Sequence, residues 1–210
     1  QSDCDMLNQL GLTHQSRALP NHDVHLAITM FEACLSLDSH RFEPMVNVGV
    51  AYTEIGELDK AQKVYQRALA IAPNDFALLN NLAHLQVTRE EYVEAYDLSK
   101  RALELRPRHP MIRTTYQLTL VGMGNYHFER KEYVAALEYY YEAPKVQAAR
   151  PYVLEKIVMT MKEMGMVERL TPHLKRLVGL MPEREDLKVW WEELSGSSGG
   201  GGGGDGGGEE

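Results

Sequence analysis

The chain has 210 residues, of which 44% are hydrophobic and 25% charged, and its formal net charge at pH 7 is −8. No block of lysine or arginine stands out, which argues against a nucleic-acid partner because phosphate binding needs a clustered basic face. No apolar run reaches the roughly 18 residues of a membrane-spanning helix, so no membrane insertion is expected.

The ends and the cysteines of the chain give weaker information. The chain begins with Gln1 rather than methionine, which predicts a mature form or a piece of a longer protein. The sequence leaves the compartment unknown, with the cytoplasm as the best guess. Two cysteines, Cys4 and Cys34, are too few for a disulfide framework in a chain of this length. We expect buried reduced thiols, with a single bridge between them as the alternative.

One type of helical segment recurs along the chain. The strings "AQKVYQRALAIAP" and "AYDLSKRALELRP" begin 34 residues apart, and both end at proline, which stops a helix. In four of the five copies a small residue comes first, with Leu170 in the fifth, and a bulky residue usually follows four positions later. The first positions are Ala27, Ala61, Ala95, Ala136 and Leu170, with gaps of 34, 34, 41 and 34 residues.

A second helical segment precedes each copy and usually carries a small residue, such as Gly49 in "MVNVGVAY". A small residue lets the neighbouring helix approach, and a bulky residue of that helix fills the space. The pattern resembles the tetratricopeptide repeat (TPR) family, whose 34-residue unit is a helix–turn–helix. The resemblance covers residues 4–184 and implies an all-α, right-handed α-solenoid of about five repeats with a C-terminal capping helix.

The first four expected repeats follow one another along the chain. The first, residues 4–41, fits the unit only if four extra residues lie between its helices, within "HQSRALPNHD". The second and third, residues 42–75 and 76–109, fit it closely. Seven extra residues, "PMIRTTY", precede the fourth repeat, residues 117–150, and are expected to lengthen its first helix by about two turns.

The later repeats depart further from the family pattern. In the fourth repeat, one tyrosine of the run Tyr139 to Tyr141 is expected to pack, and the others to lie on an outward surface as a second protein contact. The fifth repeat, residues 151–184, contains Pro172. Because proline is tolerated in the first turn of a helix, the second helix of this repeat is expected to begin late, near Thr171.

Two segments follow the last repeat. Residues 185–194 are expected to form the capping helix, since a solenoid needs an element that covers its last apolar face. Of Trp190 and Trp191, one is expected to pack and the other to be partly exposed. The acidic, glycine-rich segment 195–210 is expected to be a disordered tail.

In TPR proteins the first helix of each repeat lines the concave face, so the resemblance assigns four positions of each such helix to peptide binding. Primary amides recur at one of these positions, in Gln9, Asn47 and Asn81, and an amide can both donate to and accept from a peptide backbone. This row resembles the asparagine ladder in the TPR region of O-linked N-acetylglucosamine transferase, although asparagine here is also common across the family. The predicted peptide-binding residues are Asn8, Gln9, Glu43, Val46, Asn47, Val50, Asn80, Asn81, His84, Asn125 and Lys156.

A different known TPR ligand is not expected to bind. Chaperone-binding TPR domains hold a C-terminal carboxylate with lysine, asparagine and arginine side chains. If repeats two to four formed this clamp, its basic positions would hold Val46, Leu118 and Gly122, and counting from the first repeat gives no basic residue either. An acidic C-terminal chaperone peptide is therefore not expected to bind, because nothing would neutralise its charge.

Catalytic and metal-binding patterns are weak. His14, His22, Asp23 and His25 could hold zinc by residue type, but they lie at the expected insertion, where a solvated histidine is the default. His84 has asparagine and alanine at the neighbouring concave positions and so lacks a catalytic partner. Neither a G-x-S-x-G elbow nor a phosphate-binding loop occurs, so we expect no enzyme, metal or cofactor.

These patterns predict a non-catalytic protein–protein interaction scaffold or adaptor. It would bind a peptide segment of a partner protein in the concave groove, within a larger multisubunit assembly. The alternative is a substrate-selecting TPR region excised from a larger enzyme, such as a glycosyltransferase. Self-association through the atypical fifth repeat and its tryptophan pair is a third possibility.

Overall fold

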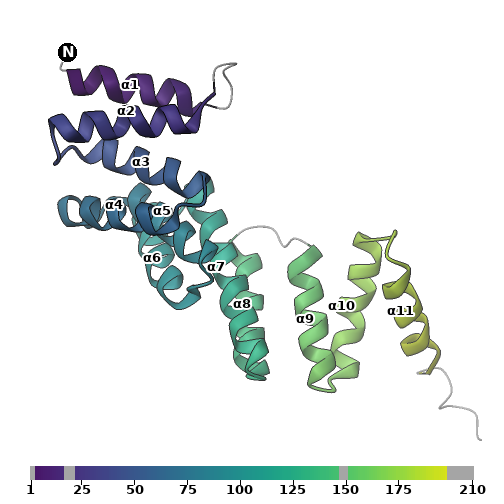
Figure 1. Ribbon diagram of the computed structural model, residues 1–210. Coiled ribbons are helices and arrows are strands. Elements are labelled where there is room, and N and C mark those ends of the chain that lie inside the picture. The colour runs from purple at the N-terminus through teal and green to yellow at the C-terminus, as the bar shows by residue number, and fades with distance from the viewer. Residues whose placement is uncertain (1–2, 17–21, 147–150, 198–210) are drawn as a thin grey trace, which may run out of the picture. The chain divides into compact units, whose positions relative to one another are not determined.

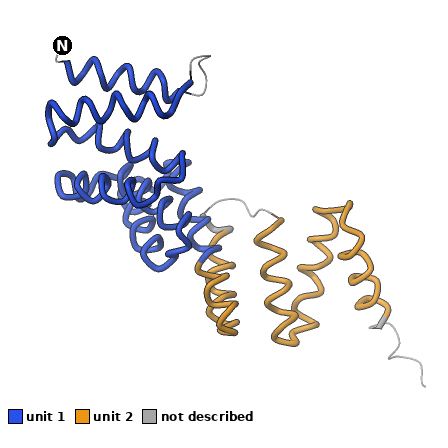
Figure 2. The backbone as a smooth tube through the Cα atoms, in the orientation of Figure 1, with its two compact units in different colours: residues 1–122 blue, residues 123–210 orange. Residues whose placement is uncertain are grey.

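The computed structural model describes residues 3–16, 22–146 and 151–197 (Figure 1). These residues form eleven α-helices and no strand, which confirms the all-α fold class. The chain divides into two compact units, unit 1 (Gln1–Gly122) and unit 2 (Met123–Glu210), shown in blue and orange in Figure 2. The predicted repeat boundaries themselves stay predictions.

Unit 1 is built from antiparallel helical hairpins in which each helix packs on the next. Its capping residues include Asp75, whose side chain accepts a 2.8 Å hydrogen bond from the Leu78 N–H at the start of a helix and satisfies one of its open donors. The helices are α1 (Asp3–Gln15), α2 (Val24–Leu37), α3 (Phe42–Glu54), α4 (Leu58–Ile71), α5 (Phe76–Thr88), α6 (Tyr92–Leu105) and the first part of α7 (Pro110–Glu129).

Unit 2 contains the end of α7 and four further helices. The whole of α7 has 20 residues, whereas α3 and α5 have 13 each, so the prediction that seven extra residues lengthen this helix is confirmed. The last helix continues to Ser197, beyond the predicted end of the capping helix, and residues 198–210 of the predicted tail lie outside the described residues. The remaining helices are α8 (Tyr133–Val146), α9 (Pro151–Glu163), α10 (Val167–Leu180) and α11 (Glu185–Ser197).

A glycine in the first helix of a hairpin lies directly against an aromatic ring of the second. A Cβ atom added at Gly49 would lie 2.4 Å from Cε1 of Tyr65, much closer than van der Waals contact. The ring therefore occupies the space that a side chain at residue 49 would need. The same relation joins Gly11 to Phe31 in unit 1 and Gly124 to Tyr140 in unit 2, at 2.5 and 2.3 Å.

The small residues of the second helices are buried, as the predicted packing of large side chains beside small ones requires. All four alanines at the first position of the pattern are fully buried, and the aromatic residues that follow three of them, including Tyr65, are 0–1% exposed. This places one apolar stripe of each second helix against its own hairpin. The alanines are Ala27, Ala61, Ala95 and Ala136.

The turns inside four hairpins share a backbone conformation that the sequence pattern did not reveal. Residues 56, 90, 131 and 165 have φ between 61° and 81°, the left-handed region that glycine adopts at low cost. Two of them are Gly56 and Gly165, but the other two are Glu90 and Lys131. The repeat is therefore conserved in backbone geometry even where glycine is absent.

The prediction for Pro172 is wrong. Helix α10 begins at Val167 rather than near Thr171, and the proline lies inside it. The missing N–H would have bonded to the carbonyl group of Glu168, and both residues are exposed, so water can replace that bond. Burial of Leu170 and its apolar neighbours on the opposite face holds the helix together through this point.

The aromatic predictions are partly right. Tyr140 is fully buried, whereas Tyr139 is half-buried and stacks on His127, so one tyrosine of the run does pack. Trp190 and Trp191 are both half-buried, so the expected difference between them is wrong. A lysine ammonium group lies over each indole ring, Lys162 of α9 over Trp190 and Lys175 of α10 over Trp191.

The two cysteines form a disulfide bond between α1 and α2, so the expectation of reduced thiols is wrong. Helix α1 buries only Cys4 and Gly11, and Cys34 is fully buried on α2. The packing of α1 on α2 brings the two cysteines together across 30 residues of chain, which no sequence spacing alone could show. The bond therefore supplements a helix that has little core of its own.

We predict that Gly49→Ala lowers the free energy of unfolding by about 2 kcal/mol, because the new methyl group displaces the buried Tyr65 ring and this outweighs the gain in helix propensity. Chemical denaturation of the whole chain measures the change. Gly179→Ala in α10 is the matched control, since a Cβ atom there meets nothing within 4 Å. Gly179→Ala should raise stability slightly. An equal change in stability in both variants would contradict the proposed effect of the close contact between Gly49 and the Tyr65 ring.

We also predict that reduction of the disulfide lowers the stability of unit 1 by about 3–4 kcal/mol, because cross-linking over some 30 residues restricts the unfolded chain. Thermal unfolding with and without a reductant measures the effect. The double variant Cys4→Ala/Cys34→Ala should unfold like the reduced protein and ignore the reductant. A reductant that leaves the parent protein unchanged would show that the bond contributes nothing.

Candidate functional site

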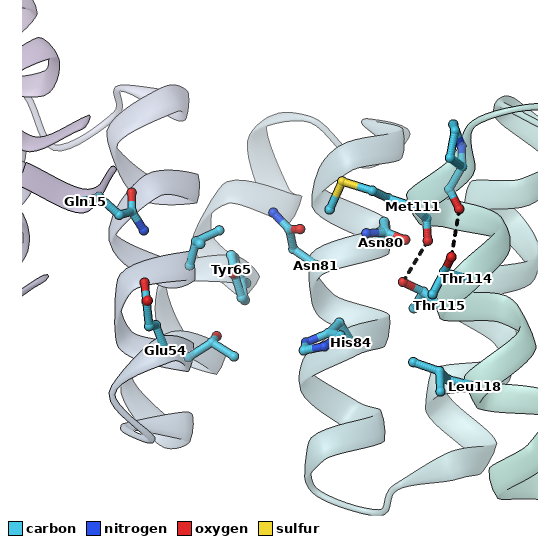
Figure 3. A pocket seen from close by; sticks show the side chains of 13 residues that line it. Gln15, Glu54, Tyr65, Asn80, Asn81, His84, Met111, Thr114, Thr115 and Leu118 are labelled. Carbon is cyan, nitrogen blue, oxygen red and sulfur yellow. Dashed lines mark hydrogen bonds between the residues drawn. The ribbon is translucent and has the colours of Figure 1, made fainter. Parts of the chain in front are cut away.

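A pocket of about 750 Å³ opens in unit 1 (Figure 3). Its walls come from the end of α1, from α3 and α5 and from the start of α7, with one tyrosine from α4. The first helices of four successive hairpins thus contribute to one site. The lining residues are Gln15, Val50, Thr53, Glu54, Tyr65, Asn80, Asn81, His84, Pro110, Met111, Thr114, Thr115 and Leu118.

Two buried polar atoms of this pocket have no hydrogen-bond partner among the described residues. Asn80 is only 6% exposed, and its Oδ1 atom accepts no hydrogen bond. The Nε2 atom of Gln15, in the opposite wall, is also buried and donates to no described group. A buried polar atom without a partner costs about 1–3 kcal/mol, so such atoms are rare in stable proteins. The described residues of the pocket therefore supply no donor to Oδ1 of Asn80 and no acceptor to Nε2 of Gln15.

Apolar side chains at the pocket remain accessible to solvent. Met111 and Leu118 in α7 are 65% and 40% exposed, and the half-buried Val50 lies in the wall formed by α3. In Figure 3, Tyr65 and Asn81 lie between the Gln15 side and the α7 side of the site. Exposed apolar residues beside a few directed polar groups are typical of a binding pocket.

The charge of the pocket is close to neutral with an acidic edge. Among the described residues that line it, Glu54 is the only carboxylate, and no lysine or arginine is present. The Nε2 atom of His22 lies 4.0 Å from Oε1 of Glu54, so this edge is partly compensated when the histidine is protonated. The described lining residues therefore offer no lysine or arginine to an anionic ligand.

The Tyr65 hydroxyl group stays neutral at ordinary pH. Burial of the ring raises the pKa of Tyr65 well above its usual value near 10, and a hydrogen bond with Thr53 offsets part of this effect. The tyrosine therefore contributes a neutral apolar ring to the pocket as well as filling the space beside Gly49.

The pocket brings together four of the predicted peptide-binding residues, Val50, Asn80, Asn81 and His84. Asn8 and Asn47 lie elsewhere and bond to each other, since Nδ2 of Asn47 donates to Oδ1 of Asn8 at 3.0 Å. This bond uses part of their hydrogen-bonding capacity to join α1 to α3. Gln9 and Glu43 are exposed and Val46 is half-buried, and none of the three lines the pocket.

The other two predicted residues belong to unit 2. The side-chain oxygen of Asn125 accepts a 2.7 Å hydrogen bond from the Tyr140 hydroxyl group, and the ammonium group of Lys156 lies over the Tyr152 ring at 5.3 Å. Their roles in binding stay predictions, and so do those of the residues outside the pocket.

Unit 2 has a smaller pocket of about 540 Å³, lined by Tyr141 among others. The Tyr141 hydroxyl group lies 3.2 Å from Nε2 of His173, and burial lowers the pKa of that histidine. Tyr141 is 38% exposed, so the predicted second contact at this tyrosine stays a prediction.

Several pocket residues were not found from the sequence. Tyr65 belongs to a second helix, and the family pattern assigned it only to the interior. Met111 and Thr115 lie in the seven-residue extension of α7, which was read as added length rather than as part of a site. Gln15 lies at the end of α1, beyond the concave positions. The extension was the one available signal, because it places extra side chains beside α5.

One of the four candidate zinc ligands at the first hairpin has a structural role. Asp23 caps α2, where its side chain accepts a hydrogen bond from the Leu26 N–H at 3.0 Å. Among the described residues, no group of three or more histidine, cysteine, aspartate or glutamate side chains could hold a metal ion.

Comparison with known proteins agrees with this architecture. A family model described as "TPR repeat" matches residues 49–88, which include all of α4 and α5. The hairpins and this match together show that the chain has the fold of a tetratricopeptide repeat protein. Two solved TPR-like structures resemble the chain along most of its length. The structure of MamA has a TM-score of 0.67 and 16% identity, and the match covers 88% of this chain and 94% of MamA. The structure of PilF of Pseudomonas aeruginosa has a TM-score of 0.59 and 18% identity, and the match covers 94% of this chain and 93% of PilF. At such identities the likeness shows the TPR fold alone.

One curated relative of this TPR chain is an N-terminal acetyltransferase A complex subunit-like protein of Schizosaccharomyces pombe. The two are 30% identical over 92 residues, which is 44% of this chain but 13% of the relative. The TPR chain thus spans a small part of that protein. Within the part of the chain that the structure describes, no helix has the length and apolar character needed to cross a membrane.

We predict that Tyr65 ionises later than the exposed tyrosines when pH is raised. A raised pKa in the folded state means that the unfolded chain loses this proton first, so stability is complete below pH 10 and falls as pH rises above that value. Absorbance at 295 nm, compared between the parent protein and Tyr65→Phe, measures this ionisation. The prediction would be contradicted if Tyr65→Phe removed an ionisation in the same pH range as that of the exposed tyrosines.

Proposed function

We propose that this chain is a non-catalytic scaffold or adaptor that binds a polypeptide segment of a partner protein in the pocket of unit 1, as part of a larger assembly. The observation that carries the proposal is the pocket itself, which combines exposed apolar side chains with amide groups from successive first helices. A polypeptide has the same two kinds of group, namely apolar side chains and amide units.

The TPR fold supports the general part of this proposal. Stacked helical hairpins present a continuous surface that suits an elongated partner better than a small molecule. The fold alone does not specify a partner, because function depends on the residues of the site. Val50, Asn80, Asn81 and His84 are the predicted residues on which the proposal rests, and Met111 and Leu118 are added by the structure.

A second candidate function is a substrate-selecting region of a larger enzyme assembly. The observation that favours it is the 30% identity over 92 residues to a protein named as an acetyltransferase complex subunit-like protein. In this case the segment held in the pocket would belong to a substrate that an associated catalytic subunit modifies. The two candidates share the site and differ in the fate of the bound segment.

We predict that Asn81→Trp weakens binding of a peptide partner by at least about tenfold, because the indole ring fills the middle of the pocket. Random twelve-residue peptides displayed on phage are selected against the whole chain. The affinities of the selected peptides for both proteins are then measured by calorimetry.

The matched control is Gln66→Trp, which adds the same ring to an exposed position of α4 outside the pocket. It should leave affinity unchanged. Selected peptides that bind both tryptophan variants as well as the parent protein would move the binding site away from this pocket, and a failure to select any peptide would oppose the proposed function.

A further inference from the structure

We infer that the pocket of unit 1 recognises an uncharged, extended stretch within a polypeptide, whose backbone carbonyl accepts a hydrogen bond from Gln15 and whose backbone N–H donates one to Asn80. This inference rests on the proposed function and specifies the chemistry of the ligand at the same site.

The unpartnered atoms are the first step. Asn80 is more than nine-tenths buried, yet its Oδ1 atom lacks a donor, and Nε2 of Gln15 lacks an acceptor among the described residues. One atom requires a donor and the other an acceptor, and each peptide unit supplies both. A water molecule could satisfy either atom singly, but only a longer ligand could satisfy both and also cover the exposed apolar side chains nearby.

The placement of the two amides is the second step. Gln15 ends α1, whereas Asn80 lies on α5 beside α7, and Figure 3 shows them on different sides of the pocket with Tyr65 and Asn81 in the region between. A single amide-sized ligand would reach one of them. An extended chain presents its N–H and carbonyl groups along its whole length, so it can meet both.

The charge of the lining is the third step. The described lining residues include Glu54 but no lysine or arginine, so a carboxylate or phosphate in the pocket would have no counter-ion and would lie near a like charge. This favours uncharged segments over acidic ones and an internal stretch over a C-terminus. Met111 and Leu118 then supply apolar contacts for side chains such as leucine.

The test uses two synthetic peptides that differ only in charge, acetyl-Gly-Leu-Asn-Leu-Gly-amide and the same sequence with Asp in place of Asn. They are titrated into the ¹⁵N-labelled whole chain, and the side-chain NH₂ signals of Gln15 and Asn80 are followed by NMR. We expect both signals to shift with saturation for the neutral peptide, and we expect the acidic peptide to bind at least about tenfold more weakly.

Two variants assign the signals and test the mechanism. Asn80→Leu and Gln15→Leu should each weaken binding of the neutral peptide by at least about tenfold. They should also unfold at no lower temperature than the parent protein, because each removes an unpartnered buried atom. Gln66→Leu, which changes an exposed amide of α4 outside the pocket, should leave both binding and the two signals unchanged.

The possible outcomes separate this inference from the proposed function. Equal binding of the two peptides, or unchanged affinity in both leucine variants, overturns the inference. If a variant fails to fold, the signals of the parent protein decide the matter, since amide signals that do not move on saturation also overturn it. Phage-selected peptides that bind unit 1 without moving either signal would leave the proposed function intact and remove this inference alone.

Discussion

The close contact between a glycine and an aromatic ring is the interaction on which three of the hairpins depend. At Gly49 the ring of Tyr65 occupies the place of a side chain, so the two helices of the hairpin approach more closely than ordinary residues would allow. The contact also fixes which face of the second helix turns inward, because the ring can enter from one direction only. The same tyrosine reaches the pocket, so the packing of the hairpin and the shape of the site are linked through one side chain.

The features that follow from local spacing could be predicted from the sequence, and those that depend on distant segments could not. The period of the small residues predicted the hairpins and the burial of Ala61. The pairing of Cys4 with Cys34 depends on how α1 lies on α2, and the unpartnered state of Asn80 depends on every side chain around it. The position of Asn80 in the first helix of its repeat predicts that it lies on the concave face, but only the structure shows whether its amide group has hydrogen-bond partners.

The disulfide and the pocket are related through α1. This helix buries few side chains of its own, yet its last residue, Gln15, forms part of the pocket wall. The bond from Cys4 to Cys34 and the hydrogen bond between Asn8 and Asn47 hold the helix against its neighbours. In a reducing compartment the position of Gln15 would depend on non-covalent packing alone, so the redox conditions under which the chain folds bear on the completeness of the site.

The longer α7 shows why an insertion of seven residues is well tolerated in such a chain. Seven residues make almost two complete turns of an α-helix, with a drift of only about 20°. A helix extended by this length presents nearly the same angular face before and after the addition, so Ile112 and Thr119, seven residues apart, are both buried. An addition of five residues would rotate the following stripe by about 140° and turn it toward solvent. A repeat array of this kind can therefore gain whole turns of helix while the apolar face of that helix keeps its direction toward the neighbouring helices.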